Sequence, residues 1–229
     1  MKKMTTFDTN DPRNIWVSPD SDSNGTDSGT GTYDNPFPGI TDALKNATPG
    51  QSIILLPGVY SGNLTIEISG SENAPIYITA GETGKAIVDG GCWYFYDTSD
   101  LIVSGLTFKN ARRGAVSVVG QCLRNRFYNM DFIDCGTGGK ASCAFYFGGA
   151  GARFNIVENC NFLRSASSDN PAIEKLSTEN AAVGLMISDG GDGAYLTNHI
   201  IRRNRFSGYD KAVILGAEND GDFESGHIV

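Results

Sequence analysis

Apolar and polar residues alternate in four similar segments of the second half of the chain, and each segment ends on a phenylalanine. The four segments are LIVSGLTF, RFYNMDF, NIVENCNF and HIIRRNRF, ending at Phe108, Phe132, Phe162 and Phe206. Alternation of this kind puts every second side chain on one face of a short strand. Two inward positions recur when the copies are aligned, the first at Val103, Phe127, Val157 and Ile201 and the second at Leu106, Met130, Cys160 and Asn204. The pattern predicts β-strands and not helices.

A further strand recurs between these copies, and we call it the leading strand of each rung. The leading strands are predicted at 115–119, 144–148, 183–188 and 212–216. Each is followed by a loop and then by a bent strand pair that ends on Phe. The predicted bends fall at Gly105, Asn129, Asn159 and Arg203. Gly and Asn tolerate the left-handed backbone that a sharp corner needs. Constant strands joined by loops of growing length are typical of a solenoid, so we predict a coil with a stack of Phe rings inside.

The first half of the chain carries the same period more loosely. Strands separated by Gly, Pro and Asn are predicted at 52–58, 76–80, 86–90 and 93–97. Ahead of them, residues 38–49 place Ile40, Ala43 and Leu44 at helical spacing. We interpret this segment as a helix that caps the first rung, although an ordinary surface helix fits the same residues.

The resulting prediction of domain organisation is a single solenoid behind a polar leader. Residues 1–36 are predicted to form an N-terminal extension and polar entry loop. Residues 37–229 are predicted to form the coil, with the cap at 38–49 and rungs from residue 52 onward.

A family resemblance rests on three stretches from Trp16 onward. These are WVSPDSDSNGTDSGTGTYDNPFPGITDALKNATPGQSIILLPGVYSGNLTI, SGSENAPIYITAGETGKAIVDGG and LIVSGLTFKN. They resemble the opening of right-handed parallel β-helix proteins of the polysaccharide-lyase type, such as alginate and chondroitin lyases, and phage tailspikes share the architecture. The resemblance implies an all-β, right-handed parallel β-helix with an N-terminal capping helix. It does not separate enzymes from non-enzymes, because both share this opening.

The resemblance also implies where chemistry would take place. In β-helix lyases the substrate lies along the outside of the leading strands, where Lys or Arg abstracts the proton next to a uronate carboxylate and calcium or arginine neutralises that carboxylate. In this chain, alternation turns the leading-strand residues Ser117, Tyr146, Met186 and Ile214 outward. None of them is an acid, a base or a metal ligand. An apolar stripe of this kind favours contact with another chain or a covering loop.

The loops before the leading strands supply the candidate catalytic residues. They are Arg112, Lys140, Arg164 and Lys175. Arg suits a forked contact with a carboxylate, and Lys is the candidate base. For any single one of them, a solvated loop charge is the favoured explanation. The insertion over 163–182 exceeds the usual length of a loop, so we expect the binding site there first.

The loops after the leading strands supply candidate calcium ligands. Asp189 and Asp192 lie in SDGGDG, and Asp220 lies in AENDGDFES. Carboxylates on adjacent rungs are suited to sharing a calcium ion, which takes oxygen ligands. Simple solvation of the same acids explains the sequence pI of 4.7 as well.

Composition and the chain ends restrict the partners. A formal net charge of −8 argues against nucleic acid. No apolar run approaches the ~20 residues that span a membrane. The start MKKMTTFDTNDPRN has no apolar core, so the chain as given shows no signal peptide. We expect an extracellular or virion location, which the protein would reach if a signal had been removed or if it were released by cell lysis. The five cysteines show no metal spacing and are predicted to be reduced core residues.

The last residues, ESGHIV at 224–229, restart the Phe-terminated pattern and stop before its corner. A coil that stops within a rung exposes an unpaired sheet edge. We therefore expect the natural chain to continue, or another chain, as in a homo-oligomer such as a trimer, to cover that end.

Two function classes remain after these considerations. The first is a non-catalytic, tailspike-like or surface-assembly β-helix that binds acidic polysaccharide. The second is a calcium-assisted lyase that cleaves uronate-containing polymers by β-elimination. The sequence favours acidic polysaccharide as the partner in both and leaves catalysis undecided.

Overall fold

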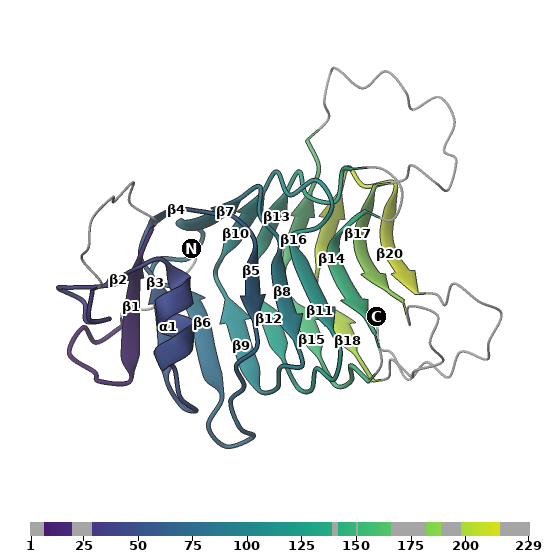
Figure 1. Ribbon diagram of the computed structural model, residues 1–229. Helices are drawn as coiled ribbons and strands as arrows, with labels where there is room; N and C mark the ends of the chain where they lie inside the picture. The colour runs from purple at the N-terminus through teal and green to yellow at the C-terminus, as the bar shows by residue number, and fades with distance from the viewer. Residues whose placement is uncertain are drawn as a thin grey trace.

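The computed structural model describes residues 7–19, 29–138, 142–149, 151–165, 182–188 and 198–215. Over these residues the chain coils, and its strands fall into three parallel sheets (Figure 1). From β3 onward, each turn of the coil adds one strand to each sheet. The predicted right-handed parallel β-helix is confirmed.

The three sheets are named by the order in which the chain enters them after the cap. The first sheet contains β1 (Asn14–Ser18), β2 (Phe37–Pro38), β3 (Ser52–Leu55), β6 (Ile76–Ala80), β9 (Leu101–Ser104), β12 (Arg126–Tyr128), β15 (Ile156–Glu158) and β18 (Ile200–Arg202). The second contains β4 (Gly58–Ser61), β7 (Ala86–Asp89), β10 (Thr107–Lys109), β13 (Asp131–Ile133), β16 (Asn161–Leu163) and β19 (Arg205–Ser207). The third, made by the leading strands in its later part, contains β5 (Leu64–Ile66), β8 (Trp93–Tyr96), β11 (Val116–Val119), β14 (Cys143–Gly148), β17 (Val183–Ile187) and β20 (Lys211–Leu215).

The predicted Phe stack forms one wall of the interior. Phe108 and Phe132 stack with ring centroids 5.5 Å apart. Phe132 and Phe162 follow at 4.6 Å, and Phe162 and Phe206 at 4.6 Å. The parallel register places these residues directly beside one another on β10, β13, β16 and β19. The predicted register of the bent strand pair is therefore confirmed.

The corner between the first and second sheets uses the left-handed backbone that the sequence predicted. Gly105, Asn129, Asn159 and Arg203 all adopt positive φ, between 53° and 71°. Arg203 takes a conformation that Gly and Asn adopt more readily. Just beyond it, Asn204 donates from Nδ2 to the carbonyl of Val157 and accepts from the backbone N–H of Cys160, both at 2.9 Å. This side chain therefore takes the place of an apolar residue at the inward position.

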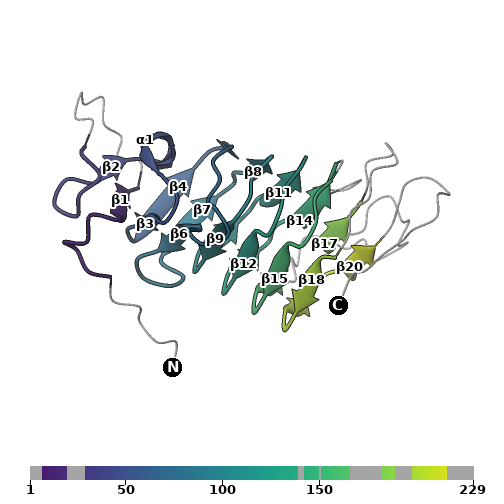
Figure 2. The ribbon, with the colours of Figure 1, turned by 90° about the horizontal axis from the view of Figure 1, so that it is seen from below.

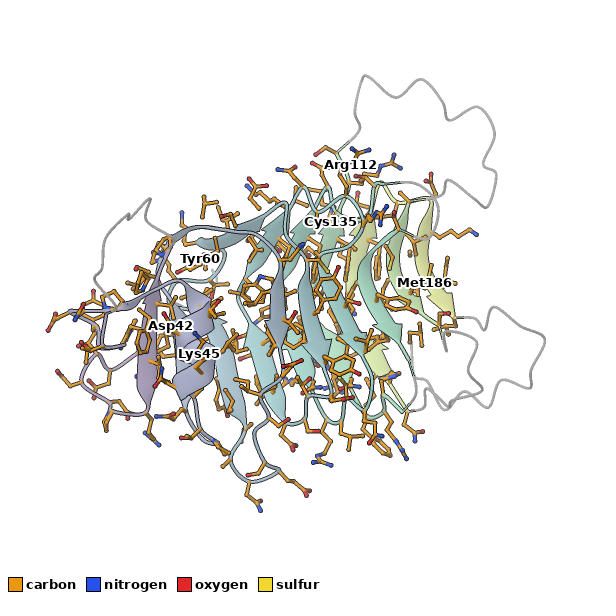
Figure 3. All side chains as sticks on the ribbon, in the orientation of Figure 1. Asp42, Lys45, Tyr60, Arg112, Cys135 and Met186 are labelled. Carbon is orange, nitrogen blue, oxygen red and sulfur yellow. The ribbon has the colours of Figure 1, made fainter. Side chains whose placement is uncertain are left out.

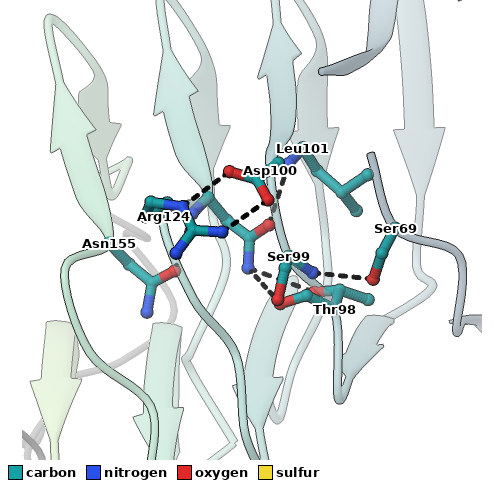
Figure 4. Close-up of polar contacts among 8 residues, drawn as sticks. Ser69, Thr98, Ser99, Asp100, Leu101, Arg124 and Asn155 are labelled. Carbon is teal, nitrogen blue, oxygen red and sulfur yellow. Dashed lines mark hydrogen bonds and ion pairs between the residues drawn. The ribbon is translucent and has the colours of Figure 1, made fainter. Parts of the chain in front are cut away.

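Buried polar side chains order the corner between the third and first sheets. Asn125 and Asn155 are fully buried. The Asn125 side chain accepts from the backbone N–H of Leu101 at 3.0 Å, and the Asn155 side chain accepts from that of Asn125 at 2.9 Å. Beside them Arg124 donates to both oxygens of Asp100, at 2.8 and 2.7 Å (Figure 4). The two asparagine contacts satisfy backbone N–H groups that the turn leaves without a ladder partner.

The N-terminal end differs from its predicted boundaries. β1 lies within the predicted extension over 1–36, yet it pairs in parallel with β3 and so belongs to the first sheet. The division at residue 36 is corrected accordingly. The sequence interpretation missed β1 because the polar run after Ser18 separates it from the other strands.

The predicted cap is a shorter helix than expected. α1 covers Ile40–Asn46 rather than 38–49, and it contacts β1, β2 and β3 (Figure 1). Ile40, Ala43 and Leu44 are buried, as the helical spacing predicted. The helix ends at Asn46, and the next residue, Ala47, has the extended backbone that leads toward Pro49. Proline disfavours helical backbone in the residue before it, which explains the early stop.

The coil is less closed at its last described strand. On β20, Val213 is half-buried and Leu215 is 43% exposed, although alternation predicted both to point inward. β20 pairs with β17 on one side, and no described strand pairs with its other side. The segment ESGHIV at 224–229, with its incomplete rung, lies outside the described residues.

Candidate functional site

The outer face of the third sheet carries a row of aligned side chains. Register places Tyr94, Ser117, Tyr146, Met186 and Ile214 side by side on β8, β11, β14, β17 and β20. The predicted alignment of the last four is confirmed. Of the row, Tyr94 is the most exposed, at 41%.

Tyr94 and Tyr96 extend this face toward the N-terminus, and the sequence interpretation missed them. Tyr96 is 49% exposed on the same strand, β8. The signal was available, because alternation in WYFYD buries Trp93 and Phe95 and turns both tyrosines outward. This strand precedes the four Phe-terminated copies, so their alignment does not include it.

A pocket of about 280 Å³ opens on this face. It is lined by Cys92, Tyr94, Arg113, Gly114, Val116, Ser117, Cys143, Tyr146, Met186 and Ser188. Arg113, one residue beyond the predicted Arg112, is exposed and sits in the loop that enters β11. Among the described residues, no hydrogen bond or ion pair engages its guanidinium. The pocket therefore combines aromatic surface with a cation available to a ligand.

Gly148 allows the Tyr146 ring to lie along β14. A methyl group added at Gly148 would come within 2.2 Å of the ring carbon Cε1 of Tyr146. The ring thus lies over the glycine and presents its surface to the pocket. Glycine at this position is required by the ring and not by the backbone, whose φ lies outside the left-handed region.

The titratable groups in the pocket are held in their neutral forms. Burial raises the pKa of the Cys92 thiol and raises that of Cys143 to about 12. The charge that Cys92 would carry on ionisation raises the pKa of the Tyr94 phenol, while Arg113 partly lowers it. At neutral pH the pocket thus offers thiols and hydroxyls as neutral groups and Arg113 as its cation. All five cysteines are free, and all but Cys92 are buried, as predicted.

The predicted catalytic arginines are not brought into this pocket. Arg112 is exposed, and its carbonyl accepts from the N–H of Gly138 at 2.7 Å. In Figure 3 it lies at the rim of the coil, away from Met186 on the third sheet. Arg164 forms an ion pair with Asp210 at 3.3 Å, and Asp210 also accepts from the N–H of Ala182 at 2.7 Å. Arg164 therefore ties together the two ends of the insertion and is already engaged by a carboxylate.

The remaining predicted site residues lie outside the described part of the chain. These are Lys140, Lys175, Asp189, Asp192 and Asp220. Among the described residues there is no group of three His, Cys, Asp or Glu side chains placed to hold a metal ion. The calcium hypothesis therefore stays a prediction from the sequence.

Glu158 on the first sheet is a buried acid that two arginines contact. It is 1% exposed, and its carboxylate accepts from Arg126 at 2.6 Å and from Arg202 at 2.7 Å. Burial alone would raise the pKa of this carboxyl, but hydrogen bonds from Arg202 and Arg126 lower it below its usual value. One acid thus joins β12, β15 and β18.

His199 is also structural. It is fully buried, and its ring stacks on Phe147 with centroids 4.5 Å apart. The other histidine of the chain, His227, lies outside the described residues.

Comparisons with known proteins agree with this geometry. A model of the chondroitinase B family matches residues 37–120. A pectate lyase L from Thermoclostridium stercorarium is 28% identical over 177 residues, covering 76% of this chain and 12% of that protein. The resemblance to parallel β-helix proteins of the polysaccharide-lyase type is confirmed. The chain spans only about an eighth of the length of that relative. The activity of the chain is therefore treated below as a proposal.

Solved structures support the fold. Pectate lyase Pel9A matches with a TM-score of 0.56 at 20% identity, covering 93% of this chain and 60% of that one. A mannuronic acid specific polysaccharide family 6 lyase from human gut microbiota matches with a TM-score of 0.56 at 18% identity, covering 76% and 42%. Likeness at this level of identity shows a shared coil and carries no information on chemistry. No helix in the described residues is long and apolar enough to cross a membrane.

Proposed function

We propose that this chain binds uronate-containing polysaccharide along the outer face of the third sheet, in an extracellular or virion setting. The observation that carries the proposal is the pocket in which Tyr94, Tyr146 and Met186 surround a surface bordered by Arg113. The name of the sequence relative supports the ligand class, because pectate is a polymer of acidic sugars.

Each part of the pocket matches one part of an acidic sugar. The rings of Tyr94 and Tyr146 offer flat apolar surface to the C–H face of a sugar ring. The guanidinium of Arg113 suits the paired oxygens of a uronate carboxylate. Strands about 4.8 Å apart repeat such surfaces along the coil, which suits a linear polymer.

The binding proposal is tested by titrating pectate oligomers into the protein by calorimetry. Arg113→Gln and Tyr94→Ala each remove one contact from an exposed position, and each is expected to weaken binding about tenfold. Arg205→Ala is the matched control, since Arg205 is an exposed arginine on the second sheet. Equal affinity in all three variants and the parent would place the polymer elsewhere.

The apolar row admits a rival occupant, a second subunit, as in a tailspike-like shaft. A concave pocket among these residues favours a ligand over a flat subunit contact. Light scattering separates the two. If the row is a subunit interface, the Met186→Glu variant will have a lower molar mass in solution than the parent protein. If the row is a sugar site, the variant and the parent will have the same molar mass.

A second candidate function is β-elimination, which the lyase relatives support. A base would take the proton next to the carboxylate, a carbon–carbon double bond would form, and the bond to the linking oxygen would break as that oxygen takes a proton. Lys140 and Lys175 are the proposed bases, with Arg112 and Arg164 as the proposed carboxylate contacts. Asp189, Asp192 and Asp220 are the proposed oxygen ligands for calcium, which would neutralise the uronate when bound.

The elimination proposal is tested by ultraviolet absorbance of the new double bond on pectate and polymannuronate, with calcium or with chelator. Lys140→Ala and Lys175→Ala should abolish the signal, and Lys45→Ala on the cap helix is the control. Binding without any absorbance change on either polymer would exclude the lyase and leave the binding proposal in place.

A further inference from the structure

A second pocket lies on the outer face of the first sheet, away from the proposed polysaccharide site. Its volume is about 200 Å³, and it is lined from β3, β6, β9 and β12 and by Phe7 from the N-terminal segment. Figure 2 shows this face, with β6, β9, β12 and β15 side by side. A pocket of this size is below the usual range for drug-sized ligands and suits a single ring.

The floor of this pocket is a pair of buried hydroxyls. Thr79 is 9% exposed and Ser104 is 6% exposed, and their oxygens lie 2.9 Å apart in a hydrogen bond. Two hydroxyls carry two hydrogens and four lone pairs. Their mutual bond uses one hydrogen and one lone pair. The other hydrogen has only a marginal acceptor, since the Thr79 oxygen lies 3.5 Å from the carbonyl of Ala80. The pair can therefore both donate to and accept from a ligand hydroxyl.

The walls of the pocket are aromatic. Tyr77 is 37% exposed on β6, and Tyr128 lies two strands away on β12. The guanidinium of Arg126 lies 4.7 Å from the centre of the Tyr128 ring. That contact, together with the ion pair of Arg126 to Glu158, holds Tyr128 in place. The amide of Asn129 adds a donor and an acceptor at the corner.

Among the residues that the structure describes, no charged side chain lines this pocket. An anion or cation would lose its hydration here without a counter-charge, which is unfavourable. Desolvation costs less free energy for an uncharged ring that carries several hydroxyls than for an ion. The hydroxyl and amide groups of the pocket replace the ring's hydrogen bonds to water, and the tyrosines cover its C–H face.

We propose that this pocket is a second carbohydrate site, which binds one uncharged pyranose unit. It differs from the third-sheet site in ligand class, since that site has the cation Arg113 and the described lining of this one has hydroxyls and the Asn129 amide. The chain thus presents an acidic-sugar site and a neutral-sugar site on different sheets. The proposal does not depend on the first site and stands if that one fails.

The test uses saturation-transfer NMR with the methyl glycosides of glucose, galactose, mannose and rhamnose at millimolar concentration. At least one of them should bind the parent protein. The double variant Thr79→Val with Ser104→Ala removes both hydroxyls while nearly keeping their shape, so it should weaken that binding about tenfold or more. Tyr77→Ala, at a half-exposed position, should weaken the binding of the glycoside as well. This variant tests the proposal if the double variant does not fold.

Tyr94→Ala on the third sheet is the matched control and should leave binding of the methyl glycosides unchanged. Absence of signal for all four probes would overturn the proposal. So would binding that survives in both pocket variants, or binding that only Tyr94→Ala removes.

Discussion

At the scale of single residues, a glycine can determine how a neighbouring large side chain lies on the surface. Gly148 has no side chain, and the Tyr146 ring occupies the space that one would take. Tyr146 can then lie flat beside Tyr94 and Met186 in the third-sheet pocket. The sequence predicted that Tyr146 points outward, but alternation alone does not indicate how an outward ring lies, because that depends on its neighbours in space.

The first prediction concerns this glycine. Gly148→Ala should displace the Tyr146 ring, because the added methyl group would come within 2.2 Å of it. The ring is the end of a mobile side chain, so the free energy of unfolding should change by less than about 1 kcal/mol. Affinity for pectate oligomers should nevertheless fall several-fold. Unchanged calorimetric affinity would show that the ring does not contact the polymer.

A second prediction concerns the Phe stack. Phe132 is fully buried between Phe108 and Phe162, so Phe132→Ala should lower the free energy of unfolding by about 3–5 kcal/mol. Leu163→Ala is the control, since Leu163 is 43% exposed and should change stability by less than about 0.5 kcal/mol. Similar urea midpoints for the two variants would contradict the role of the stack.

At the scale of elements, the rungs are joined by contacts that cross from strand to strand. Glu158 on β15 receives Arg126 from β12 and Arg202 from β18, so one buried acid holds three consecutive strands of the first sheet. The strands themselves are short, and such cross-links fix their order. Because the pKa of Glu158 is lowered in the fold, its ionised form stabilises the native state.

The pH dependence of that stabilisation gives a third prediction. A lowered pKa contributes stability that is complete above the ordinary glutamate value of 4.5 and is lost as pH falls through the lower folded value. The difference in unfolding free energy between the parent and Glu158→Gln should therefore be constant near neutral pH and shrink below about pH 4.5. Urea titrations at several pH values measure it. A difference that grows in acid would contradict the assigned ion pairs.

The strands and corners were predictable from the sequence, and the loops were not. The inward row from Val103 to Ile201 and the left-handed corner from Gly105 to Arg203 repeat in every copy, so alignment alone revealed them. Arg112 and Arg164 sit in loops of different length, where no period relates one to the other. Arg164 pairs with Asp210 through a contact that only the coiled chain creates. The buried setting of Glu158 escaped prediction for the same reason.

At the scale of the whole molecule, a single coil displays different chemistry on each outer face. The third sheet has the pocket with Arg113, and the first sheet has the uncharged pocket above Thr79 and Ser104. A coil of this kind keeps its interior constant while the outer rows vary, so binding surfaces can change without disturbing the core. The central claim is that polysaccharide lies on the third sheet.

Hydroxyl-radical footprinting with and without pectate tests that claim most directly, because it reports which side chains the polymer covers. We predict protection of Tyr94, Tyr146 and Met186, all of which line the third-sheet pocket. Phe154 and Leu163 are exposed elsewhere and should be oxidised equally in both samples. Protection of those two residues, with full oxidation of Tyr94 and Met186, would contradict the account.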